Sequence, residues 1–134
     1  MRYLKTFENY THPRMSYYTK EENKKSFEVM CEIKDILFEL SDANYDTLVE
    51  YADSGCPTSR GLYEISTVPV LGIRIRKDVG PLWNNDEEKM EFDDVILRLL
   101  KYANSEGYKY KSEISPFYYN DFEKNDCYRI WLYK

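Results

Sequence analysis

Apolar residues recur every three or four positions in two separate stretches of the chain. The first set is Phe27, Met30, Ile33, Ile36, Leu37 and Leu40, and the second is Phe92, Val95, Ile96, Leu99, Leu100 and Ala103. At this spacing each set forms one apolar stripe on an otherwise polar helix surface. The pattern therefore predicts two amphipathic helices that each turn one side toward a common core.

Local signals mark where these helices begin and end. Thr19 opens a Thr-x-x-Glu capping box, in which each side chain satisfies an orphan backbone donor of the first turn. Asn85 or Asp86 is in position to cap the second helix. Asn44 and Gly107 follow the two stripes, and both residue types tolerate the left-handed backbone that ends a helix.

Four stretches alternate between apolar and polar residues and are bounded by turn-forming residues, which predicts four strands. They are residues 45–51, 68–77, 108–114 and 127–134. In the second stretch Ile73 and Ile75 alternate with Arg74 and Arg76, so the two kinds of side chain point to opposite faces. An aromatic loop between the last two strands contains Phe117, Tyr118, Tyr119 and Phe122.

The helix, its stop signal and the following strand recur with an offset of 63 residues, so that Ile33 aligns with Ile96 and Asn44 with Gly107. One α-β-β unit cannot bury its apolar face alone, whereas two units side by side can. We therefore expect an α+β fold with a four-stranded, mostly antiparallel sheet, both helices on one face and the other face open. The chain is expected to be a single domain, residues 1–134, with an N-terminal arm (1–18), a first unit (19–79) and a second unit (80–134).

Composition limits the classes of function. The 134 residues are 43% hydrophobic and 32% charged, which is typical of one globular domain. A net charge of −5 argues against broad, non-specific binding of duplex DNA. The start of the chain has no signal-peptide pattern, and the longest apolar run, residues 68–73, is too short to span a membrane. These features, with three cysteines that form no C-x-x-C pair, favour a cytoplasmic protein with reduced thiols.

The sheet face away from the helices is the main candidate for binding. If Ile73, Ile75, Ile130, Leu132, Tyr108 and Tyr110 face the helices, basic and aromatic residues face solvent. The candidate binding residues are Arg74, Arg76, Arg129, Trp131 and Tyr133, with Phe117, Tyr118 and Tyr119 of the aromatic loop. An exposed Trp131 would mark a contact surface for a protein partner or a second copy. The same groups would also suit single-stranded nucleic acid or a nucleotide, although Asp46, Glu50 and Glu113 on that face weaken the attraction for phosphate.

Catalytic and metal-binding patterns are weak. The carboxylates between Asp86 and Asp94 fall in the first turns of the second helix, where the helix dipole favours negative charge, so we interpret them as structural. His12 is the only histidine, which gives little support to a histidine base or metal site. We therefore expect no enzymatic activity, no metal and no cofactor.

One nucleophilic alternative lies in the loop between Gly55 and Gly61. Cys56 and Arg60 suggest a phosphate-binding cysteine loop, but that motif requires arginine six positions after the cysteine, and residue 62 is leucine. A reactive Cys56 thiol beside Arg60 remains an alternative hypothesis, and a plain polar loop is the simpler interpretation.

Several segments resemble small uncharacterised proteins of tailed bacteriophages. They are residues 1–8 (MRYLKTFE), 32–40 (EIKDILFEL), 73–77 (IRIRK), 92–95 (FDDV) and 99–102 (LLKY). The resemblance implies a phage-encoded accessory or structural protein made inside a bacterial cell, and it assigns no site residues. The sequence as a whole thus predicts a non-enzymatic interaction module that recognises a protein, with nucleotide or single-stranded nucleic acid binding as the alternative.

Overall fold

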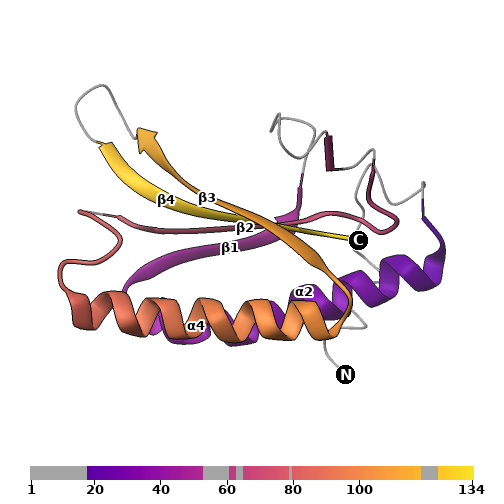
Figure 1. Ribbon diagram of the computed structural model, residues 1–134, viewed down its shortest axis with the longest axis horizontal. Coiled ribbons are helices and arrows are strands. Elements are labelled where there is room, and N and C mark those ends of the chain that lie inside the picture. Colours follow the sequence, from indigo (N-terminus) through magenta and orange to yellow (C-terminus); the bar gives the residue numbers. More distant parts are fainter. Residues whose placement is uncertain (1–17, 53–60, 63–64, 79, 119–123) are drawn as a thin grey trace.

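The computed structural model describes residues 18–52, 61–62, 65–78, 80–118 and 124–134. Its helices and strands, in chain order, are α2 (Lys20–Asp42), β1 (Tyr45–Tyr51), β2 (Leu71–Lys77), α4 (Asp86–Ser105), β3 (Lys109–Tyr118) and β4 (Lys124–Tyr133) (Figure 1). Residues 1–17 of the N-terminal arm, which include His12, lie outside the described residues, as do Cys56 and Tyr119, so the expectations about them stay predictions.

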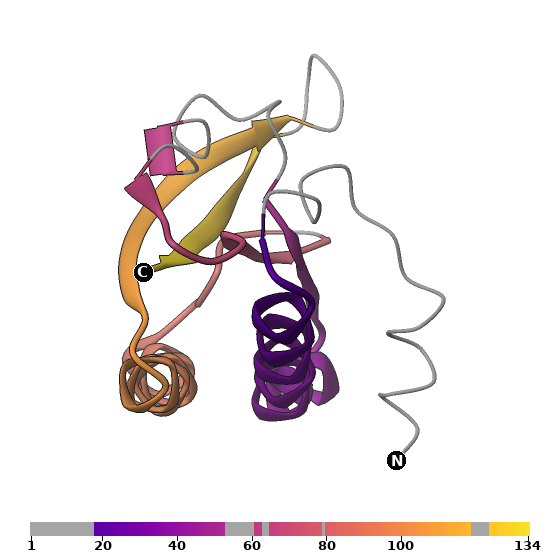
Figure 2. The same ribbon diagram turned by 90° about the vertical axis from the view of Figure 1, so that its right-hand side faces the viewer.

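The four strands form one open sheet in the order β1-β2-β4-β3, and every neighbouring pair is antiparallel. Helices α2 and α4 lie side by side beneath one face of this sheet, which we call the helix face (Figure 2). The predicted α+β architecture is therefore confirmed. Strands β2 and β4 occupy the centre, and β1 and β3 form the two edges.

The predicted helix boundaries are also confirmed. The Thr19 side chain accepts a hydrogen bond from the backbone N–H of Glu22, and Asn85 caps α4 through the N–H of Glu88. After each helix the chain enters the left-handed region, at Asn44 (φ 69°) and Gly107 (φ 90°). The two units therefore end their helices by the same device, as the 63-residue offset predicts.

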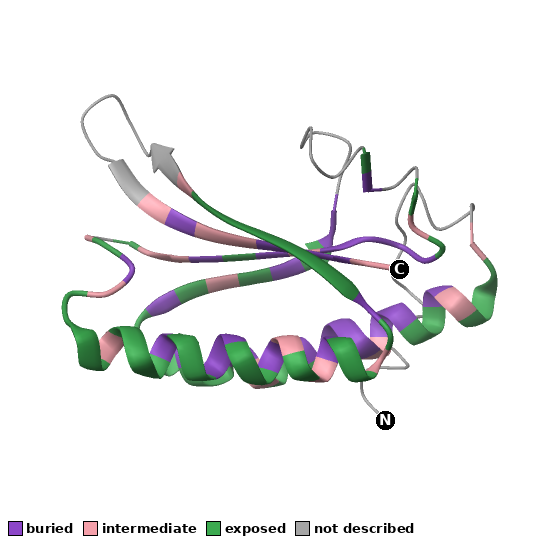
Figure 3. Ribbon diagram, viewed as in Figure 1, coloured by how far each residue is buried: buried purple, intermediate pink, exposed green. Residues whose placement is uncertain are grey.

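The main core lies between the helices and the helix face of the sheet (Figure 3). Its most deeply buried members, each no more than 1% exposed, include Ile33, Ile73, Leu99, Ile130 and Leu132. Burying each such side chain contributes about 1.5–3 kcal/mol to folding. The apolar stripes and alternating strand residues expected from the sequence supply this core.

Three strand boundaries differ from expectation by three or more residues. Strand β2 begins at Leu71 instead of residue 68, and β3 continues to Tyr118 instead of ending near residue 114. The backbone of Phe117 and Tyr118 thus belongs to a strand, paired with Asn125 and Lys124, and the prediction that these residues lie in a loop is wrong. The longer β3 is explained by strand pairing, because β4 begins earlier than expected and supplies hydrogen-bond partners for the additional residues.

The opposite face of the sheet, which we call the outer face, is covered at one end. Trp131 is only 5% exposed and packs with Ala52, Leu62 and Val70 in a second apolar cluster. The chain entering β2 lies over this end of the face and is tied to the last strand by the bond from the Thr67 N–H to the Lys134 carbonyl, at 2.9 Å. The prediction that Trp131 is exposed is therefore wrong, because Leu62, which lies between β1 and β2 in the chain, packs with it together with Ala52 and Val70.

Candidate functional site

The outer face beyond the Trp131 cluster is a charged surface. Strand pairing places five cations there, Arg74, Arg76, Lys109, Lys111 and Arg129, with three carboxylates, Asp46, Glu50 and Glu113. Their direction confirms the alternation predicted from the sequence. The chain as a whole has a net charge of −5, whereas cations outnumber carboxylates among these described residues of the outer face.

Three guanidinium groups gather on the two central strands. Arg74 of β2 lies directly opposite Arg129 of β4. Arg76 is also on β2, two residues after Arg74. Residues directly opposite each other on neighbouring antiparallel strands have Cβ atoms about 4.5–5.5 Å apart. The positive charges of Arg74 and Arg129 therefore lie close together on the same face. We call Arg74, Arg76 and Arg129 the arginine cluster.

Edge carboxylates neutralise part of this charge. A terminal nitrogen of Arg76 lies 3.1 Å from Asp46 Oδ2, and the Arg76 Nε donates to the same oxygen at 3.2 Å. Arg74 makes a looser pair with Glu50, with 3.6 Å between nitrogen and oxygen. Both carboxylates are about half exposed, so each pair is screened by water and contributes little to stability.

Arg129 has a different environment from the other two arginines. Its Nε atom is buried and has no hydrogen-bond partner among the residues that the structure describes. Strand pairing sets Arg129 between Arg74 and Glu113, yet no ion pair joins it to a carboxylate within the described part of the chain. A buried donor without a partner costs about 1–3 kcal/mol, and a bound acceptor would recover part of that free energy.

A hollow of about 270 Å³ lies beside the cluster, lined by Asp46, Thr47, Leu48, Arg74, Arg76 and Cys127. Among these lining residues Cys127 is only 1% exposed. Ser115 lies opposite Cys127 on β3, and its Oγ is buried and has no hydrogen-bond partner among the described residues. This volume is near the lower limit for small-molecule pockets, which suits a carboxylate or similar side-chain group better than a whole cofactor.

The structure brings together only part of the predicted binding set. Arg74, Arg76 and Arg129 share one surface, whereas Trp131 is covered and Tyr133 is half-buried against it. A stacking surface for bases therefore lacks its main ring among the described residues of this face. Leu48 and Cys127 also line the hollow but were not among the predicted binding residues, although strand alternation from Arg129 places Cys127 on the same face.

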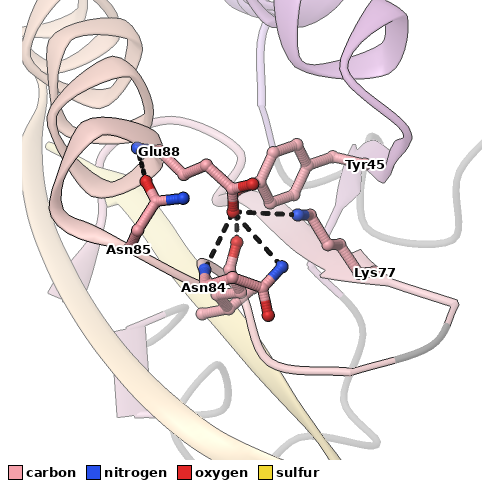
Figure 4. Close-up of polar contacts among 6 residues, drawn as sticks. Tyr45, Lys77, Asn84, Asn85 and Glu88 are labelled. Atoms are coloured by element: carbon pink, nitrogen blue, oxygen red, sulfur yellow. Dashed lines mark hydrogen bonds and ion pairs between the residues drawn. The ribbon is translucent and has the colours of Figure 1, made fainter.

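The predicted structural role of the carboxylates in α4 is visible around Glu88 (Figure 4). Its carboxylate accepts hydrogen bonds from the backbone N–H of Asn84 at 2.8 Å and from Lys77 Nζ at 3.5 Å. The Asn84 N–H hydrogen bond is the largest effect and lowers the Glu88 pKa from its ordinary value of 4.5. Burial is the next largest and opposes it, and the charge of Lys77 adds to the lowering. Together with the Asn85 cap, these contacts satisfy donors around the start of α4.

A pocket of about 300 Å³ beside this cap is lined in part by Tyr45, Lys77, Glu88, Glu91 and Asp94. The Tyr45 hydroxyl donates to the Leu82 carbonyl (Figure 4). Burial, then the charges of Glu88 and Glu91, raise the pKa of the Tyr45 phenol, so it stays protonated at neutral pH and serves as a donor instead of a base. Within the described ranges, no group of three or more histidine, cysteine or carboxylate side chains is arranged to hold a metal ion.

Within the described part of the chain, no helix is long and apolar enough to span a membrane. Comparison of the chain with protein-family models, curated proteins and solved structures gives no significant match.

Proposed function

We propose that this protein is a non-enzymatic recognition module that binds a carboxylate-bearing segment of a partner protein on the outer face of its sheet. The observation that carries the proposal is the buried, unpartnered Nε of Arg129 beside the opposed Arg74. Arginine presents donors in a planar fork that matches a carboxylate, and such charge-assisted bonds are stronger than neutral ones. An incoming carboxylate would neutralise the cluster and supply the missing acceptor.

The arrangement favours an acidic protein segment over nucleic acid. Single-stranded nucleic acid binds by stacking bases on exposed rings as well as by phosphate contacts. Trp131 is buried, and the three outer-face carboxylates would repel a continuous run of phosphates. A protein segment can place one or two carboxylates at the arginines and avoid those repulsive positions.

The resemblance to small phage proteins sets the biological context of the proposal. It supports a phage-encoded accessory or structural protein that acts in the cytoplasm of a bacterial host. The partner to test first is then a host or virion protein with an exposed acidic segment.

A direct test is fluorescence anisotropy with a labelled peptide rich in Asp and Glu, titrated at low salt. We expect saturable binding that weakens as salt is added. Replacing Arg74 or Arg129 with alanine should weaken it about tenfold, equivalent to about 1.4 kcal/mol. Arg98→Ala is the matched control, because Arg98 is an exposed arginine on α4, away from the sheet, paired with Glu39.

A single-stranded oligothymidine of similar charge is the second probe. Stronger binding of the oligonucleotide than of the peptide would replace the proposed function with nucleic acid recognition. No peptide binding at low salt, or an equal loss in Arg98→Ala, would overturn the proposal. Arg129→Lys keeps the charge but removes the fork, and an affinity between those of wild type and Arg129→Ala is expected.

A further inference from the structure

Strand β3 presents an unpaired edge of the sheet to solvent. Among the described residues it pairs with β4 alone, and residues 109–114 are all exposed (Figure 3). On the helix face, Tyr110 and Ile114 are each 52% exposed. On the outer face, Lys109, Lys111 and Glu113 alternate with them. An exposed edge with free backbone groups and apolar side chains is a template for another strand.

The order of these residues is self-complementary about Ser112. If a second copy of β3 lies antiparallel with Ser112 opposite Ser112, then Lys111 faces Glu113 and Tyr110 faces Ile114 of that copy. The opposite charges meet on the outer face, and the aromatic and β-branched side chains meet on the helix face. By symmetry each pair occurs twice, and pairs of both kinds stabilise antiparallel sheets.

We propose that two copies of this chain pair through β3, with a two-fold axis at Ser112, to form a continuous eight-stranded sheet. A two-fold interface requires one surface to complement itself, and this edge does so in both charge and shape. The paired window is limited to residues 109–115, because Pro116 has no N–H to donate and would lie opposite Tyr108. The inference rests on the β3 edge alone and is independent of the proposed binding of acidic segments.

The other edge of the sheet does not share this complementarity. If two copies of β1 paired about its central residue, Leu48, then Asp46 would face Glu50 of the second copy. Like charges directly opposite each other are destabilising. Those carboxylates are also engaged with Arg76 and Arg74 within the chain. The pattern therefore selects β3 as the self-pairing edge.

A charge exchange tests the register. Sedimentation equilibrium from about 1 µM to about 1 mM should show a reversible monomer–dimer transition, as expected for a small interface. Lys111→Glu or Glu113→Lys places like charges opposite each other twice, and each should weaken dimerisation about tenfold. The double variant Lys111→Glu/Glu113→Lys restores opposite charges and should recover the wild-type dissociation constant.

Circular dichroism spectra and thermal melts of the same variants control for effects within the chain, because Glu113 also lies opposite Arg129. Lys101→Glu, an exposed change on α4, should leave the dissociation constant unchanged. Monomeric wild type throughout the concentration range would overturn the proposal. A dimer that withstands both single charge reversals in folded protein would overturn it as well.

Cross-linking gives a readout that does not depend on affinity. Ser112→Cys places two thiols directly opposite each other, so mild oxidation should give a covalent dimer that a reducing agent reverses. Lys109→Cys is the matched control on the same strand. In the proposed register residue 109 lies opposite residue 115 of the second copy, so the two introduced thiols are six residues apart along the strand, about 20 Å. Equal cross-linking of the two variants, or of wild type through its own cysteines, would contradict the proposed axis.

Discussion

Tyr45 connects three parts of the molecule through one side chain. Its hydroxyl donates to the Leu82 carbonyl, its ring packs against Phe92 with 5.4 Å between centroids, and Lys77 Nζ lies 4.8 Å from the ring centre. The side chain is 8% exposed, so these contacts form away from bulk water. One phenol thus fixes the segment that leads into α4 against the start of β1.

Tyr45→Phe tests this role by removing only the hydroxyl. The Leu82 carbonyl then loses its donor, and we expect the free energy of unfolding, measured by urea denaturation, to fall by about 1–2 kcal/mol. Tyr110→Phe is the matched control, because Tyr110 is half exposed, and its change should be within about 0.5 kcal/mol. Equal losses in the two variants would show that the Tyr45 hydroxyl bond has no special weight.

At the scale of elements, the start of α4 depends on an ionised carboxylate. The Glu88 pKa is lowered in the folded chain, because the Asn84 N–H and Lys77 stabilise its charged form. A lowered pKa means that this contribution to stability is fully present above the unfolded value, near 4.5, and is lost as the pH falls through the folded value. The start of α4 should therefore weaken in acid.

Glu88→Gln keeps the shape of the side chain and removes its charge. We expect wild type to exceed this variant in free energy of unfolding above about pH 5, and the difference to shrink as the pH falls below the ordinary carboxyl value of 4.5. Urea denaturation across this pH range gives the measurement. Glu87→Gln, at an exposed position of the same turn, should show no such pH-dependent difference. A difference for Glu88→Gln that is constant with pH would exclude the charge as its cause.

The same elements show which features the sequence could predict. Helix stripes, caps and the stops at Asn44 and Gly107 are local, so they were predicted correctly. The direction of Arg74, Arg76 and Arg129 follows from strand alternation and was also correct. The burial of Trp131 was not predictable in this way, because it depends on the path of the long connection between β1 and β2. The pairing of Arg74 with Arg129 likewise depends on which distant strands become neighbours.

At the scale of the whole molecule, apolar clusters lie on both faces of one sheet. The larger cluster is under the helices, and the smaller one joins Trp131, Leu62, Val70 and Ala52 on the outer face. The second cluster holds the β1–β2 connection against the sheet and thereby limits the outer-face surface that remains available for binding. It closes one end of the face and leaves the arginine cluster open.

Leu62→Ala tests how much this smaller cluster contributes. Leu62 is 1% exposed, so truncation leaves a cavity, and we expect the free energy of unfolding in urea to fall by about 2–4 kcal/mol. Ile65→Ala, three residues later and 63% exposed, is the matched control and should change it by no more than about 0.5 kcal/mol. Loss of stability in the Ile65 variant alone would contradict the assigned packing.

The strand order β1-β2-β4-β3 has a consequence for how the chain folds as it is made. Strand β4 leaves the ribosome after the other three, yet it lies at the centre of the sheet between β2 and β3. Until it emerges, β2 is unpaired on one side and β3 has no neighbouring strand. The apolar stripes of the two helices are then only partly covered by the sheet. Unpaired edges and uncovered apolar surface promote association between nascent chains. Synthesis therefore passes through an interval, ending when β4 inserts, in which the nascent chain depends most on protection by chaperones.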